Sequence, residues 1–216
     1  MTNKDNTQQS DAQSGSDGAL KGMPASLSAL ISRAQDSQSR PPVERWHPDY
    51  CGALDMRISP DGSWHYMGSP IGREALVRLF ASVLRKDEDG ETYLVTPVEK
   101  IRITVEDAPF QAVEMAVVED SGTAHLTFRT NVGDVVSVDA DHPLRFAVEP
   151  ETGGFKAYVL VRGRLEARLT RALMFDLVSH ANEGEGEHRG SFGVASGGQF
   201  FAICSMAEVE QFGALS

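Results

Sequence analysis

Four arginines in the second part of the chain could form a site for an anion. Arg162, Arg164 and Arg168 lie at even spacing around Glu166, so an extended strand would carry their guanidinium groups on one face. With Arg171, at the start of the next predicted helix, they could bind a phosphate or a carboxylate. Charged strands usually turn such a face to water, and we favour that alternative.

Two further groups of residues could contact a ligand. Arg129 and Asn131 flank a predicted tight turn, where they offer a guanidinium fork and an amide to an anion or a base edge. Asn at that place could equally serve only the turn, and we favour this slightly. Trp64 and Tyr66 share one face of a predicted strand close to Arg73 and could stack a planar ligand. We favour the alternative that these aromatic rings cover the next helix.

Signatures of common catalytic and cofactor sites are absent from the sequence. It contains no P-loop, no Rossmann glycine pattern, no HExxH and no GxSxG, and its six histidines show no metal-ligand spacing. We therefore expect no cofactor, no metal and no catalytic residue, and the pattern leans against an enzyme. Neighbouring carboxylates such as Glu106 and Asp107 leave acid–base catalysis open as an alternative.

The charge balance and the cysteines limit the partners and the compartment. The chain has 216 residues, with 20 Lys and Arg against 31 Asp and Glu, which disfavours general nucleic-acid binding. Two distant cysteines, Cys51 and Cys204, are typical of a reduced intracellular protein. Residues 1–18 lack the apolar core of a secretion signal, and no segment reaches the ~18 apolar residues of a membrane helix. We expect a cytoplasmic protein that binds no membrane.

The elements that would position these residues follow from hydrophobic period and turn residues. Residues 1–40 are expected to be disordered apart from a short helix over 25–36. The tail, 183–216, is expected to be a Gly-rich flexible segment, and a capping box at Ser205–Glu208 predicts a short terminal helix there. The body between them is predicted to hold helices over 71–84 (with Ser69 and Pro70 as N-cap and first residue) and 171–181, and strands over 56–59, 63–67, 92–96, 98–105, 112–118, 124–130, 135–138, 144–148, 157–162 and 164–169.

A shift of 101 positions brings two parts of the body into register. Gly62 falls on Gly163 and Ser69 on Thr170, and both windows are predicted as strand, turn, strand and helix. Chance similarity of two such units stays open. The shift predicts an α+β fold of two similar halves, over 41–121 and 122–182. Ligand sites tend to lie between domains, so the seam between the halves is the expected site.

Five segments together resemble a bacterial family, the domain of unknown function 1285. They are Cys51–Ile58, Gly68–Arg73, Leu94–Lys100, Val105–Phe110 and Phe128–Asp134, and the resemblance spans about 41–181. It implies a duplicated α+β architecture whose second half is superficially like a pleckstrin-homology domain. It also implies a nucleotide-like ligand between the halves and a link to signal transduction. The motif positions that it offers as site residues are Arg57, Arg73, Lys100, Asp107, Arg129, Asn131 and His142.

Three functions follow, in order of preference. The first is a regulatory protein that binds a small anionic ligand, nucleotide-like as the resemblance implies, at the seam through these seven residues and Trp64. The second is a protein–protein adaptor that docks a partner through its pleckstrin-like half and its C-terminal segment. The third is an enzyme in which Asp107, His142 and an arginine converge in one pocket.

Overall fold

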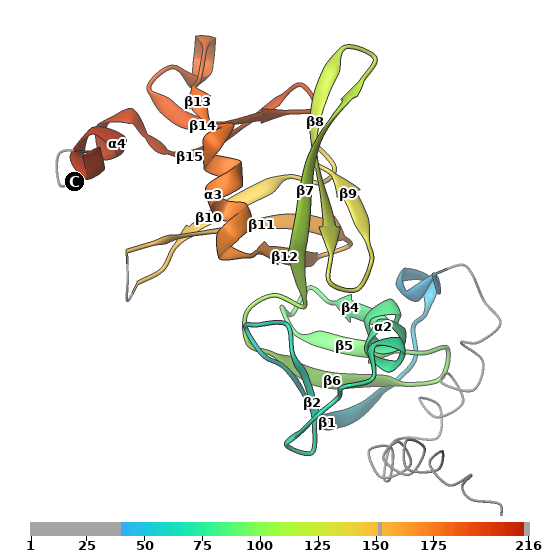
Figure 1. The fold of residues 1–216 in the computed structure, drawn as a ribbon. Helices are drawn as coiled ribbons and strands as arrows, with labels where there is room; N and C mark the ends of the chain where they lie inside the picture. Colours follow the sequence, from blue (N-terminus) through green and yellow to red (C-terminus); the bar gives the residue numbers. More distant parts are fainter. Residues whose placement is uncertain (1–39, 151–152, 214–216) are drawn as a thin grey trace, which may run out of the picture.

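The computed structural model describes residues 40–150 and 153–213. They form two similar halves, both rich in β-sheet with few helices, and Figure 1 shows one half above the other. The expected disorder and short helix near the N-terminus lie outside the described residues. No helix within the described ranges is long and apolar enough to cross a membrane. The cytoplasmic location and the pleckstrin-like character of the second half stay predictions.

The first half is a six-stranded sheet with one helix beside it. Its strand order is β3-β2-β1-β6-β5-β4, in which β1 and β6 are parallel and all other pairs antiparallel. A 3-10 turn, η1 (Val43–Arg45), precedes the sheet. The elements are β1 (Tyr50–Ile58), β2 (Trp64–Tyr66), β3 (Ser69–Pro70), α2 (Glu74–Ser82), β4 (Leu84–Lys86), β5 (Thr92–Val95) and β6 (Lys100–Val105).

The aromatic residues of β2 belong to the core of the first half. Trp64 and Tyr66 are buried, and the Trp64 ring stacks on Phe80 of α2 with 6.2 Å between the ring centroids. For Trp64, the interpretation that the ring covers the next helix is confirmed. Stacking of a ligand on Trp64 is wrong, because that side chain is 2% exposed.

The second half is another six-stranded sheet, of order β10-β11-β12-β7-β8-β9. Only β12 and β7 run parallel in it. The elements are β7 (Phe110–Asp120), β8 (Thr123–Thr130), β9 (Val135–Ser137), β10 (Leu144–Val148), β11 (Phe155–Arg162), β12 (Leu165–Leu169) and α3 (Arg171–Ser179). The Thr170 hydroxyl caps α3 by accepting a hydrogen bond from the backbone N–H of Leu173, as expected for an N-cap residue.

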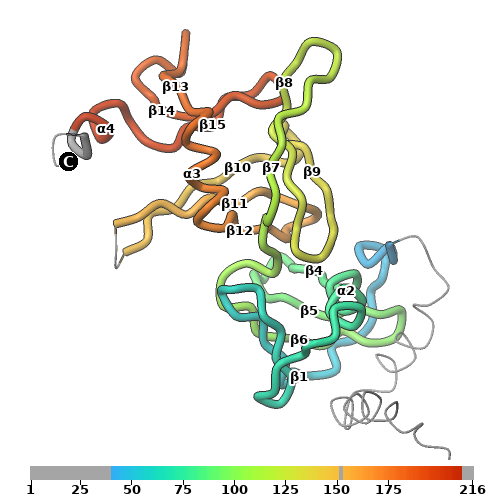
Figure 2. Tube along the Cα trace, viewed as in Figure 1, coloured from blue at the N-terminus to red at the C-terminus, as the bar shows by residue number. Residues whose placement is uncertain are grey.

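The boundary between the halves lies earlier than the sequence predicted. The chain leaves the first sheet at the end of β6, Val105, and enters the second at the start of β7, Phe110, so the expected boundary after residue 121 is wrong. Figure 2 shows β6 in the lower half and β7 in the upper half. The predicted strand over 112–118 looked like a continuation of its predecessors. Its pairing with β8 and with β12, which begins 45 residues after β7 ends, places it in the second half.

The helix prediction over 71–84 also needs correction at both ends. Ser69 and Pro70 form β3, because Met67 and Gly68 both have positive φ (50° and 74°) and turn the chain back along β2. The helix therefore begins at Glu74, and Leu84 already belongs to β4. The hairpins β1–β2 and β11–β12, each followed by a helix, are the two units that the 101-residue shift aligned.

The C-terminal segment, expected to be flexible, forms a third sheet. It has the strand order β13-β14-β15, with β13 (Asn182–Glu183), η2 (Gly186–His188), β14 (Ser191–Ser196) and β15 (Gln199–Ser205), followed by α4 (Met206–Gly213). The Ser196 hydroxyl fixes this sheet to the second half, accepting from Leu126 N–H (2.8 Å) and donating to the Val138 carbonyl (2.7 Å). The predicted capping box is confirmed, since the Glu208 carboxylate accepts from the Ser205 N–H at 2.8 Å.

Candidate functional site

A pocket of about 360 Å³ lies between the two halves. The first half contributes Ile71, Gly72, Glu74, Val77 and Arg78, and the second half contributes Val113, Arg129 and Asn131. Its position agrees with the expectation that a site would lie at the seam. The pocket combines three aliphatic side chains, two guanidinium groups, one carboxylate and one amide.

The start of α2 forms one wall of this pocket. Arg73 is the N-cap residue, has an extended backbone and makes no capping hydrogen bond with its side chain. The first N–H groups of a helix have no partner inside the helix, so the Gly72–Glu74 segment presents partial positive charge beside the pocket. The Arg73 side chain is exposed and has no ion pair among the described residues.

Among the described residues, the two arginines of the pocket are held only by exposed carboxylates. Arg129 forms a two-pronged pair with Glu114, whose side chain is 63% exposed, with 2.6 Å from Nε to Oε2. Hydrogen bonding within this pair lowers the pKa of Glu114 and raises that of Arg129. Arg78 donates to Glu74 at 3.0 Å along one face of α2, and the Glu74 side chain is 83% exposed. Exposed pairs of this kind contribute little to stability, so both guanidinium groups can exchange partners.

Asn131 supports a contact between the halves next to the pocket. Its Oδ1 accepts the backbone N–H of Gln111 at 3.0 Å, and the Gln111 side chain donates to the Pro60 carbonyl at 2.5 Å. A Cβ on Gly62 would lie 2.8 Å from Gln111 Cγ, and the φ of Gly62 is +81°. The turn between β1 and β2 therefore needs glycine both for its conformation and for this close approach.

Arg162 joins the halves at the other end of α2. Its Nη2 donates to the Ala81 carbonyl at 2.7 Å, in the last turn of the helix, and its guanidinium lies 4.6 Å from the centre of the Phe110 ring. Asp134 pairs with both Arg162 and Arg40. The Arg162 side chain is only 16% exposed, and burial lowers its pKa. Because its guanidinium group already binds Ala81 and Asp134, Arg162 is not available to a ligand.

The predicted arginine face does not converge on one point. Arg162 binds Asp134, Arg164 binds Glu88 at 2.9 Å, and Arg168 binds Asp107 at 2.9 Å. The anion site that these three arginines could have formed with Arg171 is therefore wrong, and each is paired with a nearby carboxylate, as the favoured alternative implied. None of these carboxylates lies on the strands that carry the arginines. The spacing of the arginines along the sequence therefore could not reveal their partners.

The segment between the halves is fixed by adjacent carboxylates. Glu106 accepts from Arg57 of the first half at 2.7 Å. Asp107 accepts from the Tyr158 hydroxyl of the second half at 2.7 Å, and burial together with this hydrogen bond raises the pKa of Tyr158 to about 12. The convergence of Asp107 with His142 that the enzyme alternative requires is not found, because His142 instead contacts Asp139, with 3.3 Å from Nδ1 to Oδ1.

The eight sequence-predicted site residues thus divide into two sets. Arg129 and Asn131 line the pocket, and Arg73 adjoins it. The others lie in contacts of their own: Trp64 in the core, Arg57 with Glu106, Lys100 with Asp87 at 3.2 Å, Asp107 with Tyr158 and His142 with Asp139. Sequence reasoning missed Glu74, Arg78 and the aliphatic residues of the pocket. The Glu74–Arg78 spacing on a helix was the available signal.

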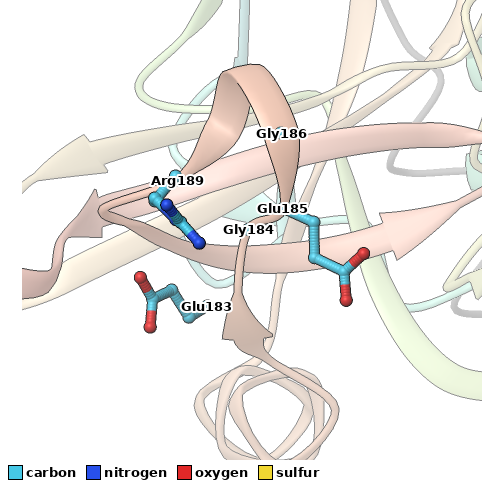
Figure 3. A pocket seen from close by; sticks show the side chains of 5 residues that line it. All are labelled: Glu183, Gly184, Glu185, Gly186 and Arg189. Atoms are coloured by element: carbon cyan, nitrogen blue, oxygen red, sulfur yellow. The ribbon is translucent and has the colours of Figure 1, made fainter.

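A second pocket, of about 480 Å³, lies in the loop between β13 and β14. Figure 3 shows Glu183 and Arg189 on one side of it and Glu185 turned outward. Its lining consists of these three side chains and two glycines, all from one half, and it has no apolar wall. No group of three or more metal-ligating side chains is found in the parts of the chain that the structure describes. The pocket between the halves, which has both charged and apolar walls, is therefore the better candidate site.

Comparison with known proteins gives the family. The N-terminal domain model of a domain of unknown function, DUF1285, matches residues 41–108, and its C-terminal domain model matches residues 109–203. This chain belongs to the DUF1285 family. The resemblance inferred from the sequence motifs is confirmed, and the junction between the two matches coincides with the change of sheet.

Two crystal structures of DUF1285 proteins resemble this chain. That of a family member from Silicibacter pomeroyi DSS-3 is 42% identical, covers 84% of this chain and 97% of its own, and superposes with a TM-score of 0.76. That of a member from Shewanella baltica OS155 is 28% identical, covers 58% of this chain and 91% of its own, and has a TM-score of 0.48. A search of curated proteins finds no match.

Proposed function

We propose that this DUF1285 protein is a regulatory binding protein that holds a small ligand with an anionic group between its two halves. The observation that carries the proposal is the pair of guanidinium groups in the seam pocket. Arg78 comes from the first half and Arg129 from the second, and each is tied only to an exposed carboxylate. A ligand held by both would bridge the halves.

An anionic group of the ligand can take the place of the carboxylate that now pairs with Arg129. A carboxylate or phosphate group matches the planar fork of Arg129, and it would replace Glu114, which returns to water. Removing an exposed partner costs little, whereas the new contact forms inside a partly enclosed pocket where electrostatic attraction is stronger. The uncapped start of α2 adds partial positive charge beside the same pocket.

The size and lining of the pocket favour a small ligand. A volume of about 360 Å³ lies toward the lower end of the range for small-molecule sites. With Trp64 buried, no aromatic ring lines the pocket, so a nucleobase would contact aliphatic side chains alone. A nucleotide-based ligand with a signalling role is an alternative form of this proposal, and adenosine monophosphate serves as its probe.

The proposal is tested by calorimetric titration of the full chain with a short-chain carboxylate, inorganic phosphate and adenosine monophosphate. We expect at least one to bind with a dissociation constant below about 1 mM, and Arg129→Gln to weaken it about tenfold or more. Arg102→Gln is the matched control, since Arg102 is 47% exposed and lies away from the pocket lining. Absence of binding by all three probes at millimolar concentration would overturn the proposal.

The adaptor function has one observation in its favour. On the outer face of α3, Phe175 is 65% exposed and Val178 is 38% exposed, and exposed apolar groups of this kind mark docking surfaces when they are contiguous. The C-terminal sheet is fixed to the second half through Ser196, so deleting it would disturb the fold as well as any partner. Phe175→Glu in a pull-down is the cleaner test, and unchanged partners would remove this alternative.

A further inference from the structure

We infer that the ligand of the seam pocket is a zwitterion, a small amino acid with an aliphatic side chain. The inference rests on the proposed function and adds the ligand class to it. It follows from the lining of the pocket, which offers a site for a negative group, a site for a positive group and an aliphatic wall.

The positive group of the ligand would bind Glu74. This carboxylate lines the same pocket as Arg78 and Arg129, and only its Oε2 accepts a hydrogen bond, from Arg78, among the described contacts. An ionised carboxylate has about four acceptor positions, so Glu74 can accept from an ammonium group while it keeps Arg78. A ligand with only negative charge would leave this acceptor unmatched and would be repelled by it.

The charge of the whole pocket supports the same conclusion. Its two guanidinium groups are balanced by Glu74 and by Glu114, the partner of Arg129. A site with no net charge gives little attraction to a polyanion at long range. It still orients a ligand that carries one charge of each sign, because complementary groups lie at separate places.

The aliphatic side chains of the pocket indicate the third group of the ligand, an apolar side chain. Ile71 and Val77 come from the first half and Val113 from the second, and all three side chains are half-buried. A short aliphatic side chain placed among them would remove apolar surface of both halves from water. The ligand class with a carboxylate, an ammonium group and an aliphatic side chain on one small framework is the aliphatic α-amino acid.

Four matched probes test the inference in calorimetric titrations of the full chain. They are L-leucine, 4-methylpentanoate (the same acid without the amino group), 3-methylbutylamine (the same chain without the carboxyl group) and adenosine monophosphate. We expect L-leucine to bind at least tenfold more tightly than any of the other three, because only it satisfies both charged sites.

Variants of the carboxylate separate recognition from pocket shape. Glu74→Gln should weaken L-leucine about tenfold and leave 4-methylpentanoate unchanged or tighter, since Arg78 is then released. Arg129→Gln should weaken both ligands. Glu119→Gln, an exposed carboxylate near the β7–β8 turn, is the matched control and should change neither.

The outcomes separate a failure of the zwitterion inference from a failure of the proposed function. Equal binding of L-leucine and 4-methylpentanoate, or tighter binding of adenosine monophosphate, would overturn the zwitterion while the anionic ligand stands. Equal weakening of both acids by Glu74→Gln would show that Glu74 only shapes the pocket, which also overturns the inference. Failure of every probe, inorganic phosphate included, would overturn the proposed function itself.

Discussion

The two ends of α2 use arginine in opposite ways. At the start of the helix, Arg78 and Arg129 are paired with carboxylates that are mostly in water. At its last turn, Arg162 is 16% exposed, binds the Ala81 carbonyl and pairs with Asp134, which is 12% exposed. The residue type is the same, and burial of the partner decides whether the guanidinium is free for a ligand or fixed in the structure.

The largest effect is expected at the buried end. Arg162→Met leaves Asp134 with only Arg40 among the described residues and removes the side-chain donor to the Ala81 carbonyl. We expect the free energy of unfolding to fall by about 3 to 5 kcal/mol in urea titrations. Arg129→Met, at the exposed end, should leave the unfolding midpoint unchanged. Equal losses in the two variants would contradict the comparison.

The close approach of the halves gives the next effect. Gly62→Ala should lower the free energy of unfolding by about 2 to 3 kcal/mol, from its positive φ and from the contact with Gln111. Gly90→Ala is the matched control, because Gly90 has a φ of +83° and nothing within 4 Å of an added Cβ. It should lose about 1 kcal/mol. If Gly62→Ala lowers the free energy of unfolding no more than Gly90→Ala does, the contact with Gln111 adds no cost, which would contradict a close approach of the halves at Gly62.

The fixed segment between the halves gives a pH-dependent effect. Tyr158→Phe removes the hydrogen bond to Asp107 and should cost about 1.5 kcal/mol near neutral pH. Burial and that hydrogen bond raise the pKa of Tyr158 from 10.0 to about 12, so its contribution is complete below pH 10 and is lost as the pH rises toward 12. Tyr93, also raised to about 12, adds a second loss in the same window. Stability measured from pH 8 to 11.5 should therefore fall less steeply in Tyr158→Phe, and identical slopes would argue against this account.

The smallest effect is expected for an exposed ion pair that crosses the seam. Arg164 and Glu88 come from different halves, and their side chains are 55% and 87% exposed. Glu88→Gln should change the free energy of unfolding by less than about 0.5 kcal/mol. If the free energy of unfolding falls by more than about 1 kcal/mol, exposure of the partner would not distinguish arginines that stabilise the fold from those that do not.

Much of the fold could be predicted from hydrophobic period and turn residues. The predicted hairpin 157–169 and the helix after it correspond to β11, β12 and α3. The short strand β3 was missed because Ser69 and Pro70 also suit a helix start, whereas Gly68 in the preceding turn favours a hairpin. The C-terminal sheet was missed because glycine suggested flexibility. Gly193 instead sits where a Cβ would lie 2.2 Å from the Phe201 carbonyl oxygen, so it serves close packing of β14 on β15.

The candidate site could be predicted only in part, because its residues meet through tertiary contacts. Arg129 and Asn131 carried a local signal, the turn that follows β8. The partner of Arg162 lies 28 residues away and that of Arg168 lies 61 residues away, so the sequence could not show which arginines are already occupied. The aliphatic wall formed by Ile71 and Val113 depends on how the halves meet, which no local pattern determines.

The most direct test of the seam site is methyl NMR of the full chain during titration with L-leucine and, separately, adenosine monophosphate. We expect the methyl signals of Ile71, Val77 and Val113 to shift together with one of these ligands, while those of Val148 and Val194 stay in place. In Arg129→Gln the same shifts should need about tenfold more ligand or more. Shifts confined to residues outside the seam, or none with either ligand at millimolar concentration, would contradict the account.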